Sequence, residues 1–148
     1  MRLALTEAEK ATQAEEVPVG AVLVYEERII ARGFNRTESL HDPTAHAEMF
    51  ALRAAAAHLK SWRLSGCSLY VTLEPCAMCA GALVLARIDR LVFGASDPKA
   101  GACGTLFNIV QDHRLNHEVD VTGGVLADDA VKMMKSFFRD LRNRREKV

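Results

Sequence analysis

The sequence contains no apolar run long enough to cross a bilayer, which excludes a membrane-spanning helix as the basis of its fold. Residues 1–5 lead directly into Thr6 and Glu7 and not into a signal-peptide core, so we expect a cytoplasmic protein. The four cysteines do not require a disulfide framework. The sequence also has no internal repeat, low-complexity tract or linker, and we therefore expect one domain over residues 1–148.

The chain also lacks net charge, because 19 acidic residues balance 19 basic ones, so the whole molecule is not a polycation. Its distribution of charge is uneven. The segment 132–148 has two acidic residues, Asp140 and Glu146, and seven basic ones: Lys132, Lys135, Arg139, Arg142, Arg144, Arg145 and Lys147. A basic C-terminal helix on a neutral domain indicates a local anionic partner. The alternative is a solvated helix face, where basic residues also suit the negative end of the helix dipole.

Three residues of the types that bind zinc occur in two short motifs. His46 lies in Pro-Thr-Ala-His-Ala-Glu, and Cys76 and Cys79 lie in Pro-Cys-Ala-Met-Cys. Zinc prefers a tetrahedron of thiolates and imidazoles, and a catalytic zinc site leaves its fourth position to water. Glu48, two residues after His46, is a carboxylate that can move the protons of such a water. The sequence therefore predicts a zinc site that activates water.

The spacing places this predicted site at the N-termini of two helices. We expect Thr44 to cap a helix that carries His46 and Glu48, which lie roughly 200° apart around a helix of 3.6 residues per turn. Both can approach one metal only beyond the N-terminus of that helix. Pro75 is expected to place both cysteines on the first turn of a second helix, and the positive ends of the two helix dipoles favour thiolates.

Each motif alone has other interpretations. A Cys-x-x-Cys pair also occurs in redox sites and in zinc knuckles, and the group could be a structural metal site or a buried pair of thiols. The combination of His-x-Glu with Pro-Cys-x-x-Cys, in this order, matches the signature of zinc deaminases. The presence of Glu48, which is not a ligand, favours a catalytic site.

Hydrophobic periodicity and turn residues predict helices and strands that alternate after an opening hairpin. This order is typical of a mixed sheet covered on both faces. A polar loop is expected over 35–42, and a long loop or short-helix region over 97–116. The predicted strands are 17–25, 28–34, 67–73, 90–95 and 118–122, and the predicted helices are 3–15, 44–59, one from Cys76 through Arg87 and one from about 126 onward.

Further sequence blocks accompany the two metal motifs. They are Glu16–Val22, Asn35–Arg36, His41–Glu48, Val71–Ala82, Val92–Ala95, Asp97–Gly101 and Phe137–Arg139. With these blocks the sequence resembles, over nearly its whole length, the bacterial tRNA-specific adenosine deaminases within the cytidine deaminase-like superfamily. The metal signature is specific for the superfamily, whereas the flanking blocks and the Phe-Phe-Arg helix favour the tRNA branch.

The resemblance implies a three-layer α/β/α sandwich with a central five-stranded mixed sheet, one zinc ion per subunit and a homodimer. It also implies conversion of adenosine to inosine at the wobble position of the anticodon stem-loop of a tRNA. Zinc lowers the pKa of its bound water. Glu48 would then take a proton from that water and pass it to the ring, so that hydroxide attacks C6 and ammonia leaves.

The resemblance also implies residues that bind the substrate. Asn35 would hold the flipped base or its ribose, although asparagine is also common in turns. Val19 and Leu73 could form walls of the base pocket, or they could be ordinary core residues. Asp97 could accept a hydrogen bond from a ribose 2′-OH, or it could belong to a turn beside Pro98.

Other expected RNA contacts lie later in the chain. Lys99 belongs to the same block as Asp97, and Arg139 and Arg142 could meet phosphates from the outer face of the last helix. Phe138 fits the apolar stripe of that helix but could also stack on an extruded base. The single tryptophan, Trp62, follows a helix, and its position leaves open packing, surface and interface roles.

Two other functions remain possible from the sequence. The first is deamination of a small nucleobase or nucleoside such as cytosine or guanine, with the same zinc chemistry, although such an enzyme would not need the basic Phe-Phe-Arg helix. The second is a catalytically silent nucleic-acid-binding subunit with a structural zinc, and the presence of Glu48 argues against it.

Overall fold

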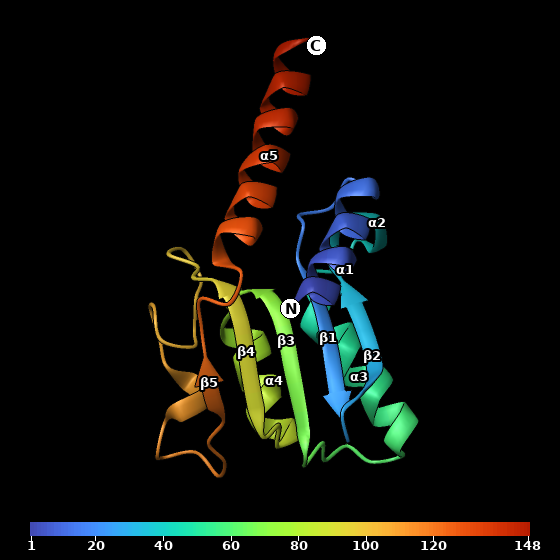
Figure 1. Cartoon of the computed structure of the whole chain (residues 1–148). Helices are drawn as coiled ribbons and strands as arrows, with labels where there is room; N and C mark the ends of the chain where they lie inside the picture. Colours follow the sequence, from blue (N-terminus) through green and yellow to red (C-terminus); the bar gives the residue numbers. More distant parts are fainter.

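The computed structural model describes residues 1–148, and its centre is one sheet of five strands (Figure 1). The strand order is β2-β1-β3-β4-β5. β1 pairs antiparallel with β2 and with β3, while β3, β4 and β5 are parallel. The predicted five-stranded mixed sheet is therefore confirmed. The strands are β1 (Gly20–Tyr25), β2 (Arg28–Phe34), β3 (Cys67–Leu73), β4 (Arg90–Ala95) and β5 (Asp120–Thr122).

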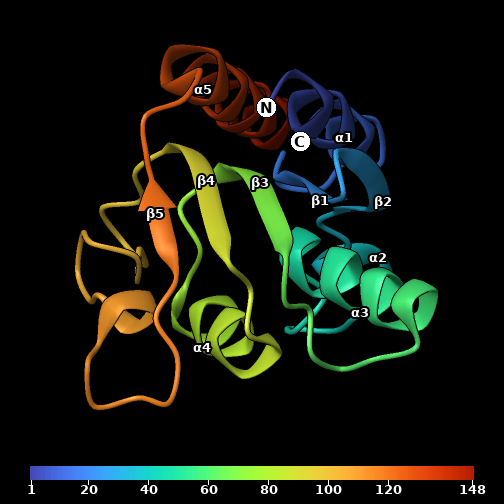
Figure 2. The same cartoon turned by 60° about the horizontal axis from the view of Figure 1, so that its bottom comes forward.

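Helices cover both faces of the sheet, as Figure 2 shows, so the predicted three-layer sandwich is also confirmed. α1 (Arg2–Gln13) and α5 (Ala127–Glu146) lie on one face. α3 (Ala47–Leu59) and α4 (Ala77–Ala86) lie on the other. Two short elements complete the chain, namely α2 (Thr37–Leu40) and the 3-10 helix η1 (Ile109–Gln111). No helix is long and apolar enough to cross a membrane.

The main core lies between the sheet and the layer formed by α3 and α4. Alternate residues of β1, β3 and β4 point into it and are fully buried, as Leu23, Leu69 and Leu91 illustrate. α3 contributes small residues, among them Ala51 and Ala55, which let its backbone approach the sheet closely. These alanines explain why a helix with little large apolar surface still packs tightly.

α1 lies directly on the backbone of β1 on the opposite face. Its buried residues include Ala4 and Ala8, and they meet the sheet at Gly20. A β-carbon placed on Gly20 would lie 2.1 Å from the carbonyl oxygen of Ala4 and 2.3 Å from the amide nitrogen of Ala8. Only glycine fits this contact, so Gly20 fixes the distance between α1 and the sheet.

The prediction was wrong in three respects, namely the start of one helix, the content of one loop and the starts of two strands. The helix of His46 begins at Ala47 and not at Thr44, and its N-cap is His46 itself. Thr44 instead donates its hydroxyl to Asp42 at 2.7 Å, in a local turn before the helix. This turn satisfies the Thr44 side chain, so the residue does not cap the helix.

The other two corrections concern segments near the sheet. The polar loop predicted over 35–42 contains α2, whose first N–H groups are held by the buried carboxylate of Glu16. The first and fifth strands are shorter than predicted and start at Gly20 and Asp120. Val17 to Val19 are apolar because they pack beside the core, and apolar character alone does not distinguish that environment from a buried strand.

β2, β3, β4 and β5 all run in one direction, because β1 is antiparallel to both of its neighbours. Their carboxyl ends therefore share one edge of the sheet, which we call the carboxyl edge. α3 is reached from the end of β2, and three residues separate the end of β3 from the start of α4. The N-termini of both helices consequently meet at the carboxyl edge, and α5 rises beyond the same edge (Figure 1).

Candidate active site

The two metal motifs meet at the carboxyl edge. His46 immediately precedes α3 and Cys76 immediately precedes α4, and both have extended backbone conformations. Cys79 lies on the first turn of α4. The His46 Nδ1 atom lies 3.6 Å from the Cys76 Sγ atom and 3.5 Å from the Cys79 Sγ atom. Residues 30 positions apart in the sequence thus form one compact cluster, which we call the His–Cys–Cys group.

The geometry of this group fits zinc. One nitrogen and two sulfur atoms lie within 4.8 Å of one another, and no fourth protein ligand belongs to the group. A tetrahedral zinc ion with Zn–S bonds of about 2.3 Å and Zn–N bonds of about 2.0 Å holds sulfur and nitrogen about 3.5 Å apart. The observed separations agree with that value, and three protein ligands are the number found in catalytic zinc sites.

The electrostatics favour a thiolate at Cys76. Its pKa is lowered to about 3, first by the neighbouring Cys79 thiol and then by His46, which together outweigh burial. The pKa of Cys79 is raised, because its proton is held between the two sulfur atoms and because the residue is buried. The pKa of His46 is raised by its contact with Cys76. Bound metal replaces such shared protons, since thiols bind metals as thiolates.

Glu48 lies beside the group without belonging to it. Its residue is only 4% exposed, and burial is the main cause that raises the pKa of its carboxyl. The Cys79 thiol adjoins this carboxyl and partly opposes that shift. A buried carboxyl whose pKa is moved toward neutrality suits a group that accepts and returns protons.

Asn35 connects the end of β2 to the helix of His46. Its side-chain oxygen accepts the N–H of Ala47, the first residue of α3, at 3.0 Å, and its own N–H donates to the carbonyl of Val19 at 3.1 Å. Asn35 therefore lies next to the His–Cys–Cys group, with its amide NH₂ not used in either bond. Val19 is 5% exposed and belongs to the core, while Leu73 is half-buried at the end of β3.

The loop after β4 holds two further predicted residues. The carboxylate of Asp97 accepts the N–H groups of Lys99 at 2.9 Å and of Ala100 at 3.3 Å, so it stabilises its own turn. Lys99 is exposed. Both bonds are made by the same carboxylate oxygen, Oδ1, which supports the interpretation of Asp97 as a turn residue. The other oxygen, Oδ2, has no donor from the protein.

The predicted residues on α5 lie on the other face of the sheet, away from α3 and α4 (Figure 2). Phe138 is 38% exposed and packs edge-on against the buried ring of Phe137, with 5.3 Å between ring centroids. Arg139 and Arg142 are exposed. The apolar stripe of α5 thus packs on the domain at Ala130 and Phe137, and these three residues do not adjoin the His–Cys–Cys group.

Sequence reasoning missed Glu74, a second buried carboxylate at the carboxyl edge. Its Oε1 atom accepts the Asp97 N–H at 3.1 Å and the Thr105 hydroxyl at 2.5 Å. Its Oε2 atom accepts the N–H groups of Cys103 at 3.0 Å and Thr105 at 3.1 Å. Burial acts to raise the pKa of Glu74, but these bonds outweigh it and the pKa is lowered. Glu74 thus fastens the loop 97–105 beside Cys76.

A signal for Glu74 was present in the sequence. An acidic residue stands between the apolar end of a buried strand and Pro75, where a charge has no obvious partner nearby in the chain. Its donors lie 23 to 31 positions later, and local patterns do not reveal contacts at that separation.

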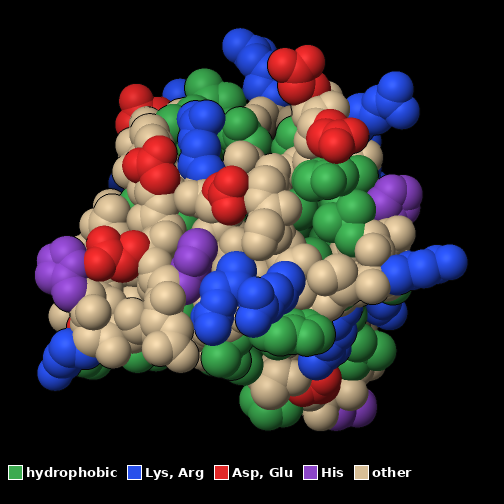
Figure 3. Space-filling view, turned by 90° about the horizontal axis from the view of Figure 1, so that it is seen from below, with side chains coloured by type: hydrophobic (Ala, Val, Ile, Leu, Met, Phe, Trp, Pro, Cys, Tyr) green, Lys and Arg blue, Asp and Glu red, His purple; other side chains and the backbone are tan.

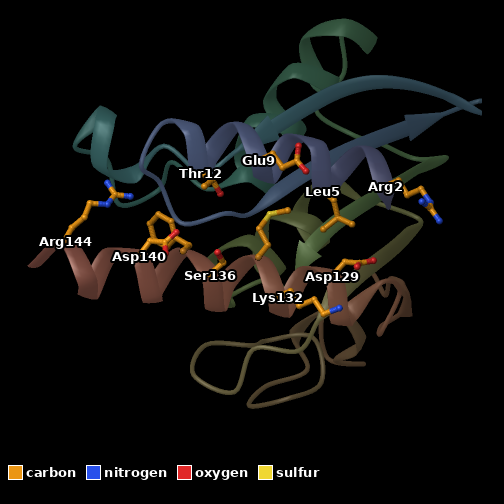
Figure 4. Close-up of a pocket in the computed structure, with 11 residues that line it drawn as sticks. Arg2, Leu5, Glu9, Thr12, Asp129, Lys132, Ser136, Asp140 and Arg144 are labelled. Atoms are coloured by element: carbon orange, nitrogen blue, oxygen red, sulfur yellow. The ribbon is translucent and has the colours of Figure 1, made fainter. Parts of the chain in front are cut away.

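A hollow that is separate from this site lies between α1 and α5 (Figure 4). It has a volume of about 580 Å³ and an apolar floor that includes Leu5, Met133 and Phe137. Acidic and basic side chains alternate along its rims. Their charges offset one another, so the hollow does not attract ligands of one particular charge. We place no substrate there, because the hollow contains none of the residues of the His–Cys–Cys group.

Comparison with known proteins identifies the class. A family model described as "MafB19-like deaminase" matches residues 1–142. This match covers nearly the whole chain, and the chain therefore belongs to that deaminase family. The match agrees with the three-layer fold and with a group of metal-binding residues at the carboxyl edge.

Within that class, the similar curated proteins are tRNA-specific adenosine deaminases. The one from Bacillus subtilis (strain 168) is 50% identical over 146 residues, which cover 99% of this chain and 91% of that protein. The one from Haemophilus influenzae is also 50% identical and covers 99% of this chain and 85% of that protein. The resemblance inferred from the sequence motifs is thereby confirmed.

Solved structures agree with this result. A structure from a study of A-to-I editing by tRNA:A34 deaminases at the wobble position of transfer RNA has a TM-score of 0.86 and 47% identity. The match covers 90% of this chain and 96% of that chain. A guanine deaminase from Nitrosomonas europaea shares the fold, with a TM-score of 0.76 and 27% identity over 92% of this chain and 81% of that chain.

Proposed function

We infer that this protein converts adenosine to inosine at the wobble position of a tRNA anticodon by hydrolytic deamination. The observation that carries this conclusion is the buried Glu48 beside a His–Cys–Cys group, in a chain half identical to tRNA-specific adenosine deaminases. Deamination of a free nucleobase is not favoured, because the similarity to the guanine deaminase is much lower. A silent RNA-binding subunit is not favoured either, because all four residues of the deaminase signature are present.

We propose that one zinc ion per subunit is held by His46, Cys76 and Cys79. When bound, zinc supplies a water of lowered pKa as the nucleophile. Glu48 would accept one proton from that water at its carboxylate and pass it to the purine ring, and would then accept the second proton of the attacking oxygen and pass it to the departing amine, which leaves as ammonia. The burial of Glu48 excludes competing solvent protons, and Asn35 holds the base or ribose with its free amide NH₂.

We propose further substrate contacts, some to the base and the anticodon loop and others to RNA farther from the His–Cys–Cys group. Val19 and Leu73 wall the base, and Asp97 and Lys99 approach the backbone of the anticodon loop from the loop that follows β4. Phe138, Arg139 and Arg142 lie on the part of α5 that rises beyond the carboxyl edge, where they meet RNA that extends from the site (Figure 1). Exchange of Asp97 for Asn tests this scheme, since an unchanged ratio of activities on RNA and DNA hairpins would contradict it.

The decisive experiment measures inosine and ammonia. The protein is incubated with a tRNA that carries adenosine at the wobble position, with the same tRNA carrying guanosine there, and with free adenosine, cytidine and guanine. We expect inosine only from the first substrate. Turnover of free guanine or cytidine without turnover of the tRNA would contradict the proposal. Metal analysis of the same sample should give one zinc per chain.

The homodimer is also part of the proposal. α4 contains no charged residue, and its outward face exposes Ala77 and Leu85, the latter to 70%. A β-carbon on Gly81 of the same face would meet nothing within 4 Å. An apolar helix face of this kind is typical of an interface between subunits. Exchange of Leu85 for Lys should therefore yield monomers in light scattering, whereas an unchanged mass would contradict this interface.

The proposal also covers the domain organisation of the chain and its location in the cell. Residues 1–148 act as one zinc-dependent deaminase domain, since a single family model spans nearly all of them. The enzyme works in the cytoplasm, where its tRNA substrate is used. Fractionation of cells together with the wobble-inosine content of their tRNA tests both statements.

A further inference from the structure

The edge of the sheet opposite the carboxyl edge carries an exposed aromatic residue among basic ones. The loop between α3 and β3 presents the exposed Lys60, Trp62 and Arg63. The half-buried Arg87 at the end of α4 and the exposed Arg90 at the start of β4 lie in the adjoining connection. The two segments lie side by side, because the N–H of Leu64 donates to the carbonyl of Ala86 at 2.6 Å. We call these five residues the Trp62 surface: Lys60, Trp62, Arg63, Arg87 and Arg90. Figure 3 looks onto this edge and shows Lys and Arg side chains gathered near its centre.

Trp62 is presented to solvent by a rigid turn. Its side chain is 64% exposed, whereas Leu64 two residues later is 1% exposed and anchors the loop. The hydroxyl of Ser61 accepts the N–H of Arg63 at 3.2 Å and donates to the carbonyl of Arg63 at 2.9 Å. Exposing a tryptophan this far forgoes the stabilisation that its burial would give, and the turn does not need it for packing.

The cations of this surface are not neutralised. None of Lys60, Arg63, Arg87 and Arg90 forms an ion pair, although Asp89, the Glu26–Glu27 turn and Asp120, the register partner of Arg90, lie at the same edge. Arg87 donates to the carbonyl of Val84 at 2.9 Å, which leaves its charge without a carboxylate partner. The guanidinium of Arg63 lies 5.0 Å from the centre of the Trp62 ring, and it covers one face only. The surface therefore combines free positive charge with an open aromatic face.

Single-stranded and loop regions of RNA have the complementary chemistry. Their phosphates attract unpaired cations, and their bases stack on exposed aromatic rings and on arginine planes. Tryptophan and arginine are also enriched at protein–protein interfaces, and the outcomes of the test below include that alternative. The combination of both features at one place favours a nucleic acid as the partner.

The location decides which part of an RNA is contacted. The Trp62 surface lies at the amino ends of β3 and β4, while Cys76 follows the carboxyl end of β3. Seven residues of β3 separate the two places, a span of about 23 Å at 3.3 Å per residue. One anticodon loop held in the site cannot also fill this surface, so the contact falls on another part of the molecule.

We propose that the Trp62 surface is a second RNA-binding surface, which contacts the tRNA outside the anticodon loop. The inference rests on the proposed function, because it assumes a tRNA substrate. It predicts that the enzyme distinguishes a full-length tRNA from an isolated anticodon stem-loop by affinity, through residues remote from the His–Cys–Cys group.

The test compares the wild type with the double variant Trp62→Ala, Arg63→Ala. The dissociation constants for a full-length tRNA and for its isolated anticodon stem-loop are measured by filter binding across a salt titration. We expect the preference for the full-length tRNA over the stem-loop to fall about tenfold or more, through loss of one stacking contact and one phosphate contact. The salt slope for full-length tRNA should fall by roughly 0.7 to 0.9 for the lost phosphate contact. Arg114→Ala is the matched control, because Arg114 is also exposed but is paired with Asp112 at 2.7 Å.

Other outcomes overturn the inference. An unchanged preference, or equal losses for both RNAs, would show that the surface does not contact the body of the tRNA. A change from dimer to monomer in light scattering would show that Trp62 lies between two copies of the chain instead. If the wild type neither binds nor deaminates any tRNA, the proposed function itself fails, and that result is separate from either of these.

Discussion

Glu48 and Glu74 are both buried carboxyls at the same edge of the sheet, yet their surroundings differ in kind. Glu74 is 2% exposed and accepts four hydrogen bonds from one loop, and its pKa is lowered. Glu48 is 4% exposed and has no comparable set of donors, and burial raises its pKa. Burial alone therefore does not decide what a carboxyl does, because the number of donors facing it determines whether it keeps its charge or exchanges its proton.

The number of donors thus gives the same type of side chain two different roles, a structural one for Glu74 and a proton-transfer one for Glu48. A carboxylate that is saturated with N–H and O–H donors is a fixed anion and holds the chain that supplies those donors. A carboxyl with few donors is stable in both protonation states and can transfer a proton. We expect Glu48 to be required for turnover and Glu74 to be required for stability, and four substitutions test that contrast.

The largest effect is expected for Glu48→Gln. Activity on tRNA should fall by about 10²- to 10⁴-fold, because the amide does not accept and return a proton. Folding and zinc content should stay at the wild-type level, since Glu48 is not in the group of metal-binding residues. Turnover, metal content and thermal midpoint are measured on one preparation, with Glu9→Gln on the exposed side of α1 as control. Loss of metal, or near-normal turnover, would contradict the assigned role.

Glu74→Gln should act in the opposite way. The new NH₂ group would face hydrogen-bond donors on one side, so two of the four donors lose their acceptor, and we expect a loss of roughly 3 kcal/mol of unfolding free energy. The loss is measured by urea unfolding, and exchange of the exposed Glu38 for Gln serves as control. Unfolding at the same urea concentration as the wild type would show that the loop does not depend on this carboxylate.

Glu16 provides a third case, with a smaller effect and a defined pH dependence. Burial acts to raise its pKa, but the N–H groups of Ser39 and Glu38 outweigh burial and lower it. A carboxyl with a lowered folded-state pKa stabilises the fold above its unfolded pKa, and that stabilisation is lost as pH falls. The stability difference between wild type and Glu16→Gln should be about 1–2 kcal/mol at pH 7 and should shrink below about pH 4.3. A difference that stays constant down to pH 3 would contradict this.

The smallest effect is expected for Thr105→Val. This change removes one of the four donors to Glu74, and because Thr105 is exposed, water can replace it. We expect a loss of about 1 kcal/mol in urea unfolding. In a double-mutant cycle with Glu74→Gln the two losses should not add, whereas full additivity would mean that the two side chains do not act together.

The sequence predicted the elements whose pattern is local. The bounds of β2, β3 and β4 agree with their predicted ranges, because each is an apolar or alternating run bounded by turn residues. The His–Cys–Cys group was also predictable, since its spacing and preceding prolines restrict it to helix N-termini. The structure brings these three residues together as that spacing requires.

Three features were missed or predicted wrongly. Thr44 was expected to cap α3, but the nearer Asp42 takes its hydroxyl. α2 was missed because the acceptor of its first N–H groups is Glu16, 22 and 23 positions earlier. Glu74 was missed for the same reason. For α2 and Glu74 the partner that decides the local conformation lies more than 20 positions away, so the sequence around the segment does not contain it. For Thr44 the partner is only two positions away, and two local roles of one hydroxyl competed.

The position of β1 in the sheet determines the order in which a growing chain can fold. β1 pairs with β2 across a turn, and α1 packs on Gly20, so these parts become available early in synthesis. β3 lies on the other side of β1, and the Gly20 N–H reaches the hydroxyl of Thr72 across 52 positions of sequence. Because a chain leaves the ribosome N-terminus first, the side of β1 that pairs with β3 stays unpaired until β3 has emerged. The His–Cys–Cys group is completed only after Cys79 has emerged as well, so the catalytic centre is among the later parts of the domain to form.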